Sequence, residues 1–285
     1  MDREAEEKWL FEISPKKKLL DFNLKEIWQY RDLLMLFVKR DIVTTYKQTV
    51  LGPLWFFIRP IFTTVVFTII FGQIAKLSTD GVPQVLFYLS GSVAWNYFSE
   101  CFSLTSDTFK KNESIFSKVY FPRLIMPLSV VISNLGKFFI QLGLFLAVLL
   151  YFIIKGSHVS PNTYILLLPF LVLLMAGLGL GGGMVISSLT TKYRDLTFLV
   201  TFGVSLLMYA SPVVVPYSEA KNTAWGWFMK YNPLTPILES FKYGWLGVGT
   251  FDAWGILYST VFTIVLLITG LLIFNRTEKS FIDTV

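Results

Sequence analysis

The sequence has very few of the side chains that bind transition metals or act as nucleophiles. It contains one cysteine, Cys101, and one histidine, His158, among 285 residues. A single cysteine excludes an internal disulfide, and the two residues together are too few for the clusters that hold zinc or activate a thiol. We therefore expect no metal site and no catalytic residue of this kind in the chain.

Charged residues are also scarce. They make up 15% of the chain, hydrophobic residues make up 54%, and the mean hydropathy is +0.59. Soluble globular domains are about a quarter charged, so this composition predicts an integral membrane protein. The net charge of +6 does not change this interpretation, because the basic residues flank apolar runs and form no stripe with interleaved aromatics. We expect no nucleic-acid partner.

A nucleotide-binding motif is missing as well. No G-x-x-x-x-G-K-[ST] phosphate loop occurs, so we expect that this chain is not an ATPase or other enzyme and that it holds no cofactor. Gly177, Gly179 and Gly182 match G-x-G-x-x-G by letter, but they lie inside an apolar run. Gly177 with Gly181, and Gly179 with Gly183, have the spacing that lets transmembrane helices approach closely. Helix packing is therefore the favoured interpretation.

Six stretches reach the length of about 20 mostly apolar residues that a spanning helix needs. They cover residues 53–75, 83–106, 124–154, 163–189, 196–217 and 253–274. The two ends and the connections on the same side hold 18 Lys and Arg, whereas the alternate loops hold five. Because cytoplasmic segments retain positive charge, we predict an all-α protein with six transmembrane helices in the cytoplasmic (inner) membrane and both termini inside.

The chain divides into three regions. Residues 1–23 form a charged extension that we expect in the cytoplasm. Residues 24–50 place apolar side chains at helical spacing and predict an amphipathic helix on the inner membrane surface. Residues 51–285 form the transmembrane domain. Within it, residues 218–252 are aromatic and are divided by prolines, which predicts two re-entrant helices near 223–230 and 235–245; the alternative is an aromatic loop on the outer leaflet.

Three charges lie inside the expected spans, where ionised groups are costly. Glu100 and Lys137 belong to consecutive antiparallel helices, so they either pair across the bundle or are solvated separately in a polar interior. Arg59 is near the inner end of the first span. Its guanidinium either meets a lipid phosphate or extends to the inner headgroups.

Aromatic residues make up 17% of the chain. Many lie in the first two spans, among them Trp55, Phe56, Trp95 and Tyr97. Some of them are explained by the enrichment of aromatic residues at the membrane–water interfaces. Sugar rings also stack on aromatic faces, so these four are candidates to line a channel for a glycan.

Residues 107–122 alternate apolar and charged side chains between the second and third spans. Phe109, Phe116 and Phe121, with Val119, are interleaved with charged residues such as Glu113. A plain connector has no need of three phenylalanines, and a short helix with exposed aromatics is suited to docking in a partner's groove. We therefore predict a cytoplasmic coupling element.

Several short strings occur in a fixed order along the chain. They are Arg40-Asp41 through Tyr46-Lys47, Leu51-Gly52-Pro53-Leu54-Trp55, Phe121-Pro122-Arg123, Pro127-Leu128-Ser129, Tyr193-Arg194-Asp195 and Asn232-Pro233-Leu234-Thr235-Pro236. From about Leu24 onward, this order resembles the permease subunit of the type-2 ABC exporter family. Within that family, the chain resembles the branch that exports lipid-linked polysaccharides such as O-antigen, capsule and teichoic acids.

The resemblance implies a homodimer bound to two copies of an ATP-binding subunit, which would bind the ATP and Mg. It implies that the amphipathic helix, the coupling element and the string Tyr193-Arg194-Asp195 meet that subunit, and that Leu51 and Gly52 lie near the substrate entrance. Lys47 and Arg59 are candidates to receive a lipid diphosphate there. The main alternative is a permease of the same type for a small amphiphile, drug or lipid. A membrane-bound transferase and a secondary transporter are less consistent with the residues present.

Overall fold

The structure, a computed structural model, describes residues 24–47, 49–116, 118–119, 121–193, 195–224 and 226–282. The expected extension at residues 1–23 and the candidate Arg194 lie outside these residues. Every regular element in the described part of the chain is a helix, which confirms the all-α class.

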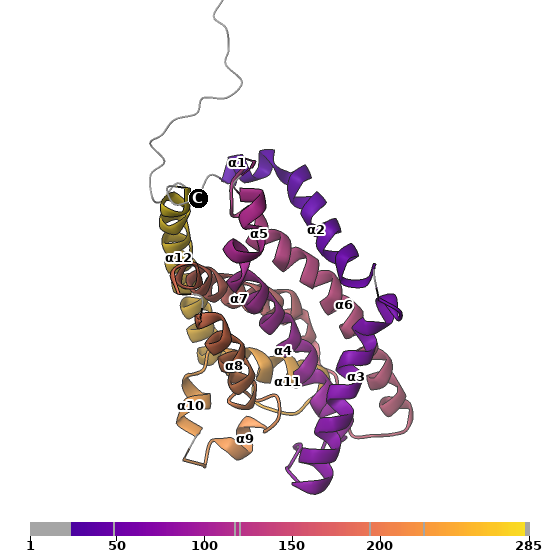
Figure 1. Cartoon of the computed structure of the whole chain (residues 1–285). Helices are drawn as coiled ribbons and strands as arrows, with labels where there is room; N and C mark the ends of the chain where they lie inside the picture. The colour runs from indigo at the N-terminus through magenta and orange to yellow at the C-terminus, as the bar shows by residue number, and fades with distance from the viewer. Residues whose placement is uncertain are drawn as a thin grey trace, which may run out of the picture.

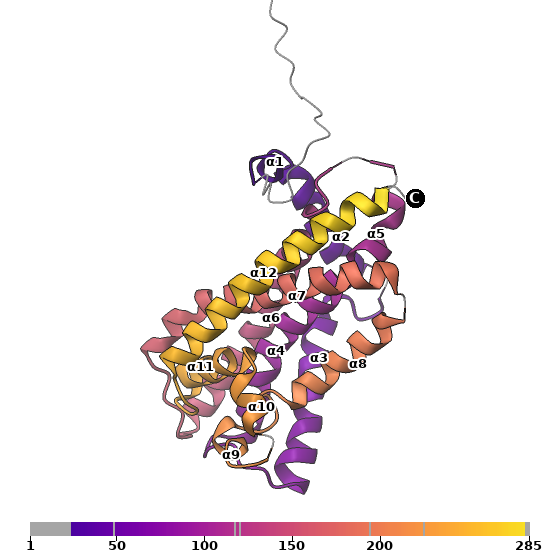
Figure 2. The same cartoon turned by 90° about the vertical axis from the view of Figure 1, so that its left-hand side faces the viewer.

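The helices form an elongated bundle with short helices at both ends (Figures 1 and 2). At one end lie α1 (Leu24–Gln29), α5 (Thr108–Phe116) and the C-terminal end of α12 (Ala253–Ile282). The opposite end carries α9 (Tyr217–Ala220) and α10 (Gly226–Tyr231), with α11 (Leu234–Leu246) beside them. The expected cytoplasmic segments thus lie at one end and the expected external segments at the other.

The centre of the bundle is formed by α4 (Gln84–Ser106) and α7 (Leu168–Lys192), with α6 (Ile125–Ile154) and α12 packed against them. Glycines permit the close approach of α7 to both neighbours. A Cβ added at Gly183 would lie 2.5 Å from the Cβ of Thr105 on α4, and one at Gly181 would lie 3.0 Å from the backbone of Leu266 on α12. The prediction that these glycines serve helix packing is confirmed.

Four helical stretches are long and apolar enough to cross a membrane. They are Gly52–Ile74, Ile125–Ile154, Thr163–Lys192 and Ala253–Thr277. The first combines a short 3₁₀ turn, η1 (Gly52–Leu54), with α3 (Trp55–Phe67) and a π-helical segment, η2 (Thr68–Ile74), and the third begins with the 3₁₀ turn η3 (Thr163–Leu167). The other two expected spans are the helices α4, which is more polar, and α8 (Leu196–Tyr209), which has 14 residues. The six-span count therefore stays a prediction.

One predicted boundary is wrong. The fifth stretch is predicted to continue to residue 217, but α8 ends at Tyr209. Pro212 and Pro216 follow, and proline restricts the residue before it to extended conformations. The last span, predicted over residues 253–274, agrees with the apolar stretch Ala253–Thr277 of α12. The helix itself continues to Ile282 through polar turns that apolar length alone does not predict.

The amphipathic segment is two helices. A break at Tyr30 separates α1 from α2 (Arg31–Tyr46). Phe37 and Val38 are buried, and α2 packs against α6. Met35 and Leu36 of the same helix are exposed. The helix therefore has one face on the protein and a separate apolar surface directed outward.

Candidate functional site

Three charges from three helices meet where α3, α4 and α6 come together. The Lys137 ammonium on α6 lies 3.1 Å from Oε2 of Glu100 on α4, and the Arg59 guanidinium on α3 lies 3.5 Å from Oε1 of the same carboxylate. The Lys137 side chain is only 15% exposed, whereas that of Arg59 is 71% exposed. The structure thus confirms that Glu100 and Lys137 pair across the bundle and are not solvated separately. It also adds Arg59, which the sequence gave no reason to join to Glu100.

The charge cluster continues as a polar contact one helical turn away. Asn96 on α4 donates to the Gln141 side chain on α6 at 3.4 Å. Positions 96 and 100 of α4, and 137 and 141 of α6, are each four residues apart and therefore share a helix face. A half-buried carboxylate with two cationic neighbours is stabilised by charge-assisted hydrogen bonds. The cluster carries one excess positive charge, and most of its exposure lies at Arg59.

The phenylalanines of the coupling element are not exposed. Phe109, Phe116 and Phe121 are all buried within this chain. They pack with Phe37 of α2, and Phe109 also contacts Phe274 of α12. The expectation that these rings present themselves to a partner is wrong. The apolar face of residues 107–122 is covered by the chain's own helices, which periodicity could not show.

Other predicted coupling residues do lie at the surface. Glu113 and Asp195 are exposed, and Val119 and Tyr193 are more than half exposed. A hydrogen bond from the backbone N–H of Phe109 to Ser187 Oγ, at 3.4 Å, joins α5 to the C-terminal end of α7, just before Tyr193. Arg123, from the string that opens α6, is buried with its guanidinium 5.0 Å from the Phe116 ring centroid. The exposed surface formed by these residues is thus polar with isolated apolar side chains.

The predicted entrance segment precedes α3. Gly52 has φ +50°, a left-handed conformation that glycine adopts without a steric penalty, and it starts the turn into α3. Leu51, Lys47 and Trp55 are exposed around this turn, and Phe56 is half-buried. Arg59 lies one helical turn beyond Trp55 on α3. The segment therefore presents apolar and cationic groups together at the surface.

Two of the predicted channel aromatics are in the wrong place for that role. Trp95 is 4% exposed and Tyr97 is 3% exposed. Trp95 packs against Phe98, and Tyr97 packs against Phe138 of α6. Both rings are part of the protein core, because α4 is surrounded by other helices. Trp55 and Phe56 on α3 remain available.

The sequence did not indicate that two ionisable side chains of α11 are buried. Lys242, counted as an external loop residue, is fully buried; its ammonium donates to the Pro212 carbonyl and lies 3.5 Å from the Phe87 ring centroid. Burial lowers the pKa of Lys242 to about 8. Glu239, one turn earlier on α11, is also buried, and burial raises the pKa of its carboxyl. Two buried ionisable groups thus lie one helical turn apart on α11.

The long apolar helices and the charges between them together define a multi-pass helical membrane protein. The chain belongs to the ABC-2 type transporter family, whose sequence profile matches residues 32–246.

Several relatives align along nearly their whole length. The chain is 25% identical over 263 residues to the O-antigen export system permease protein RfbA of Myxococcus xanthus, and the alignment covers 92% of this chain and 98% of that protein. It is 27% identical over 254 residues to RfbA of Klebsiella pneumoniae, covering 88% and 94%. It is 20% identical over 249 residues to the polysialic acid transport protein KpsM of Escherichia coli, covering 86% and 93%.

Proposed function

We propose that this chain is the transmembrane permease subunit of an ABC transporter that exports a lipid-linked polysaccharide, of the O-antigen, capsule or teichoic acid type, across the cytoplasmic membrane. ATP hydrolysis in a separate nucleotide-binding subunit drives the transport. The observation that carries this proposal is the alignment with export permeases for O-antigen and with a polysialic acid transport protein, each over more than nine-tenths of the relative's length.

The exposed surface supports a second copy of the chain as a partner. No described side chain of α8 is buried, and Phe198, Phe202 and Leu206 are largely exposed. Much of α3 is exposed too, and α3 and α8 lie along the same side of the bundle (Figure 2). In the proposed homodimer, these two helices face their counterparts and border the path of the polymer.

Trp55 and Phe56 begin α3 at the inner end of this path. Aromatic faces hold sugars by stacking, and weak contacts at several sites let a polymer move onward. Arg59 follows them on the same helix and supplies an exposed cation. We propose that it meets the diphosphate that joins glycan to lipid, since guanidinium binds phosphate oxygens bidentately.

The ATP-binding subunits, in two copies, dock at the end that carries α1, α2 and α5. Nucleotide binding closes these subunits and pushes on the permease. The aromatic cluster of Phe37, Phe109 and Phe274 joins α2, α5 and α12, so a push on α5 reaches α12 through packed rings. Exposed Glu113 and Tyr193 are the direct contacts in this proposal.

The test is deletion of the gene followed by complementation with this permease and the neighbouring ATPase gene. We expect complementation to restore the lipid-linked polysaccharide at the cell surface, measured by glycan analysis of surface and intracellular fractions. The deletion strain itself should accumulate the lipid-linked polysaccharide inside the cell. Normal surface glycan in the deletion strain would contradict the proposal.

A permease for a small amphiphile is the second candidate, and one observation favours it. A cavity of about 370 Å³ lies between α4, α7, α10 and α12, and its lining is mainly apolar. Its size is in the range of sites for single small ligands. Accumulation of a fluorescent amphiphile in the deletion strain, with glycan export intact, would favour this function instead.

A further inference from the structure

A second cavity, of about 480 Å³, lies between α2, the last turn of α4, α5 and α6. Three cations line it, one from each wall: Arg40, Lys111 and Lys137. Its size is that of a site for one small ligand or a headgroup and is far below that of a polysaccharide. The proposed transport path along α3 does not account for it.

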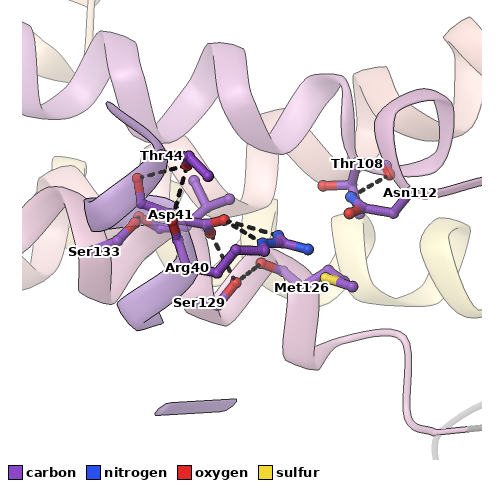
Figure 3. Close-up of polar contacts among 9 residues, drawn as sticks. Arg40, Asp41, Thr44, Thr108, Asn112, Met126, Ser129 and Ser133 are labelled. Carbon is purple, nitrogen blue, oxygen red and sulfur yellow. Dashed lines mark hydrogen bonds and ion pairs between the residues drawn. The ribbon is translucent and has the colours of Figure 1, made fainter. Parts of the chain in front are cut away.

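Asp41 gives this cavity one fixed negative charge. The Arg40 guanidinium donates to Oδ1 of Asp41 at 2.8 and 3.0 Å, and Ser129 Oγ donates to Oδ2 at 3.4 Å (Figure 3). These bonds use two of the five N–H donors of the guanidinium. Asp41 is thus held against its own helix and α6, and Arg40 retains donors on the side of the cavity.

The two lysines differ in how firmly they are held. Lys137 is mostly buried and pairs with Glu100 at 3.1 Å. Lys111 pairs with Asp107 at 3.2 Å, but this is a pair between residues four apart on one stretch of chain, with the Lys111 side chain 55% exposed. Such pairs contribute only about 0.3–0.5 kcal/mol. A ligand anion can therefore attract the Lys111 ammonium away from Asp107 at little cost in free energy. Once Lys111 has left Asp107, it gives the site a single excess positive charge.

A neutral donor lies beside Lys111. Asn112 lines the cavity, and its amide nitrogen donates to the Thr108 carbonyl at 2.9 Å. The amide group carries two hydrogens, so one remains for a ligand. Figure 3 shows the Arg40 guanidinium extending from α2 in the direction of Asn112. Donors from α2 and α5 thus converge on one space.

The rest of the lining is aliphatic. Leu104, Ile115 and Val130 contribute apolar surface to the same cavity. Met35 and Leu36 are exposed on the outward face of α2, as expected for a helix at the boundary between headgroups and hydrocarbon. The cavity therefore combines a cationic part with an apolar part, which matches a ligand that combines an anionic headgroup with acyl chains.

We propose that this cavity binds the phosphodiester headgroup of a glycerophospholipid from the inner leaflet. Lys111, Asn112 and Arg40 hold the phosphate, and the three aliphatic side chains contact the glycerol end of the acyl chains. A monoanion matches the one positive charge that Lys111 brings, whereas the fixed Asp41 carboxylate disfavours a diphosphate. The leaflet follows from the proposed orientation, on which this inference rests.

A bound headgroup would join α2 to α5. Both helices belong to the end at which the ATP-binding subunits dock in the proposed function, and the cavity separates their polar faces. A phospholipid there ties the two elements into one unit, so that membrane composition affects the coupling of ATP hydrolysis to transport. The site is thus regulatory and separate from the path of the glycan.

The experiment uses the permease with its ATP-binding subunit in nanodiscs of phosphatidylcholine that contain a small fraction of phosphatidylglycerol with a diazirine near the glycerol. After irradiation, peptide mass spectrometry maps the labelled residues. We expect labelling at Leu104, Ile115 or Val130 in the wild type. Because Lys111 makes a charge-assisted contact, Lys111→Gln should reduce this labelling about tenfold.

The matched control is Lys110→Gln, which removes a neighbouring exposed charge that does not line the cavity. It should label like the wild type. Val130→Trp, which fills the cavity and keeps every charge, should abolish labelling. Equal labelling of wild type, Lys111→Gln and Val130→Trp would overturn the proposal, as would an equal loss in Lys110→Gln.

Competition identifies the ligand. Unlabelled phosphatidylglycerol should displace the probe, and stronger displacement by a polyprenyl diphosphate would overturn the assignment to a phospholipid. The assay needs neither glycan nor ATP. A failure of the headgroup site is therefore seen even when export is normal, and a failure of the export proposal leaves the labelling result intact.

Discussion

Phe109 stacks on Phe274 with the ring centroids 4.6 Å apart and the planes 26° apart. This contact joins the short helix α5 to the last helix of the bundle. Since both rings are buried, α5 is held in place by the permease itself before any partner binds. The coupling element is therefore a packed part of this chain and not a free arm.

Truncation of the stacked ring should destabilise the permease. Phe109→Ala removes a buried aromatic side chain, a change that typically costs about 3–5 kcal/mol. We expect less folded permease in the membrane and a lower melting temperature in detergent. Val119→Ala, at an exposed position, should leave both unchanged. A stable Phe109→Ala protein that only fails to bind its ATPase would contradict this.

Reversal of an exposed charge should separate docking from folding. Glu113→Lys alters the surface of α5 and leaves the buried rings intact. We expect the permease to accumulate normally and to lose co-purification with the ATP-binding subunit. The control is Lys110→Gln on the same helix. Undiminished co-purification of Glu113→Lys would remove Glu113 from the docking surface.

Loss of the carboxylate between α3, α4 and α6 should be more harmful than loss of its exposed cation. Glu100→Gln leaves the mostly buried Lys137 without its anion, with an expected loss on the order of 1–3 kcal/mol. Arg59→Gln removes an exposed partner, worth less than about 1 kcal/mol. Thermal unfolding of both variants is the measurement. A larger effect at Arg59 on stability would show that the cluster is organised differently.

A larger side chain at the α4–α7 contact should also destabilise the folded permease. Gly183→Ala places a methyl group against Thr105, and overpacking of this kind costs about 1–3 kcal/mol. Gly143→Ala on α6 is the control, because a Cβ there meets nothing within 4 Å. The amounts of the two variants in the membrane should differ. Equal amounts would show that α4 and α7 separate without penalty.

Because of the buried Lys242 on α11, the free energy of unfolding should increase as the pH rises from about 8 to 10.5. The pKa of Lys242 is about 8 in the folded protein, below the ordinary value of 10.5, so the unfolded chain binds this proton more tightly. Its contribution to stability is therefore largest above pH 10.5 and is lost as the pH falls toward 8. Glu239 and Asp80 are the charges that act on it.

Melting temperatures of the wild type and of Lys242→Met at pH 8 and pH 10 provide the test. The wild type should gain stability relative to the variant at the higher pH. A parallel pH response of the two proteins would show that Lys242 does not titrate in this range.

The sequence by itself determined the class of protein. Runs such as residues 124–154 predicted α6 to within one residue at its start, and the glycines from 177 to 183 predicted close helix contacts that the structure confirms. Ordered short strings also led to the correct family. These features are local: hydrocarbon length, small side chains and short motifs are read along the chain without knowledge of what packs where.

Only the tertiary structure decided which side of each element is covered. Phe109 and Trp95 were expected at surfaces, yet helices distant in sequence cover both. The meeting of Arg59 with Glu100, the burial of Lys242 and the cavity at Lys111 likewise depend on contacts between separate helices. Periodicity shows that a helix has an apolar face, but the free energy of burial is the same whether that face meets its own chain, a partner or lipid. The packed structure alone distinguishes them.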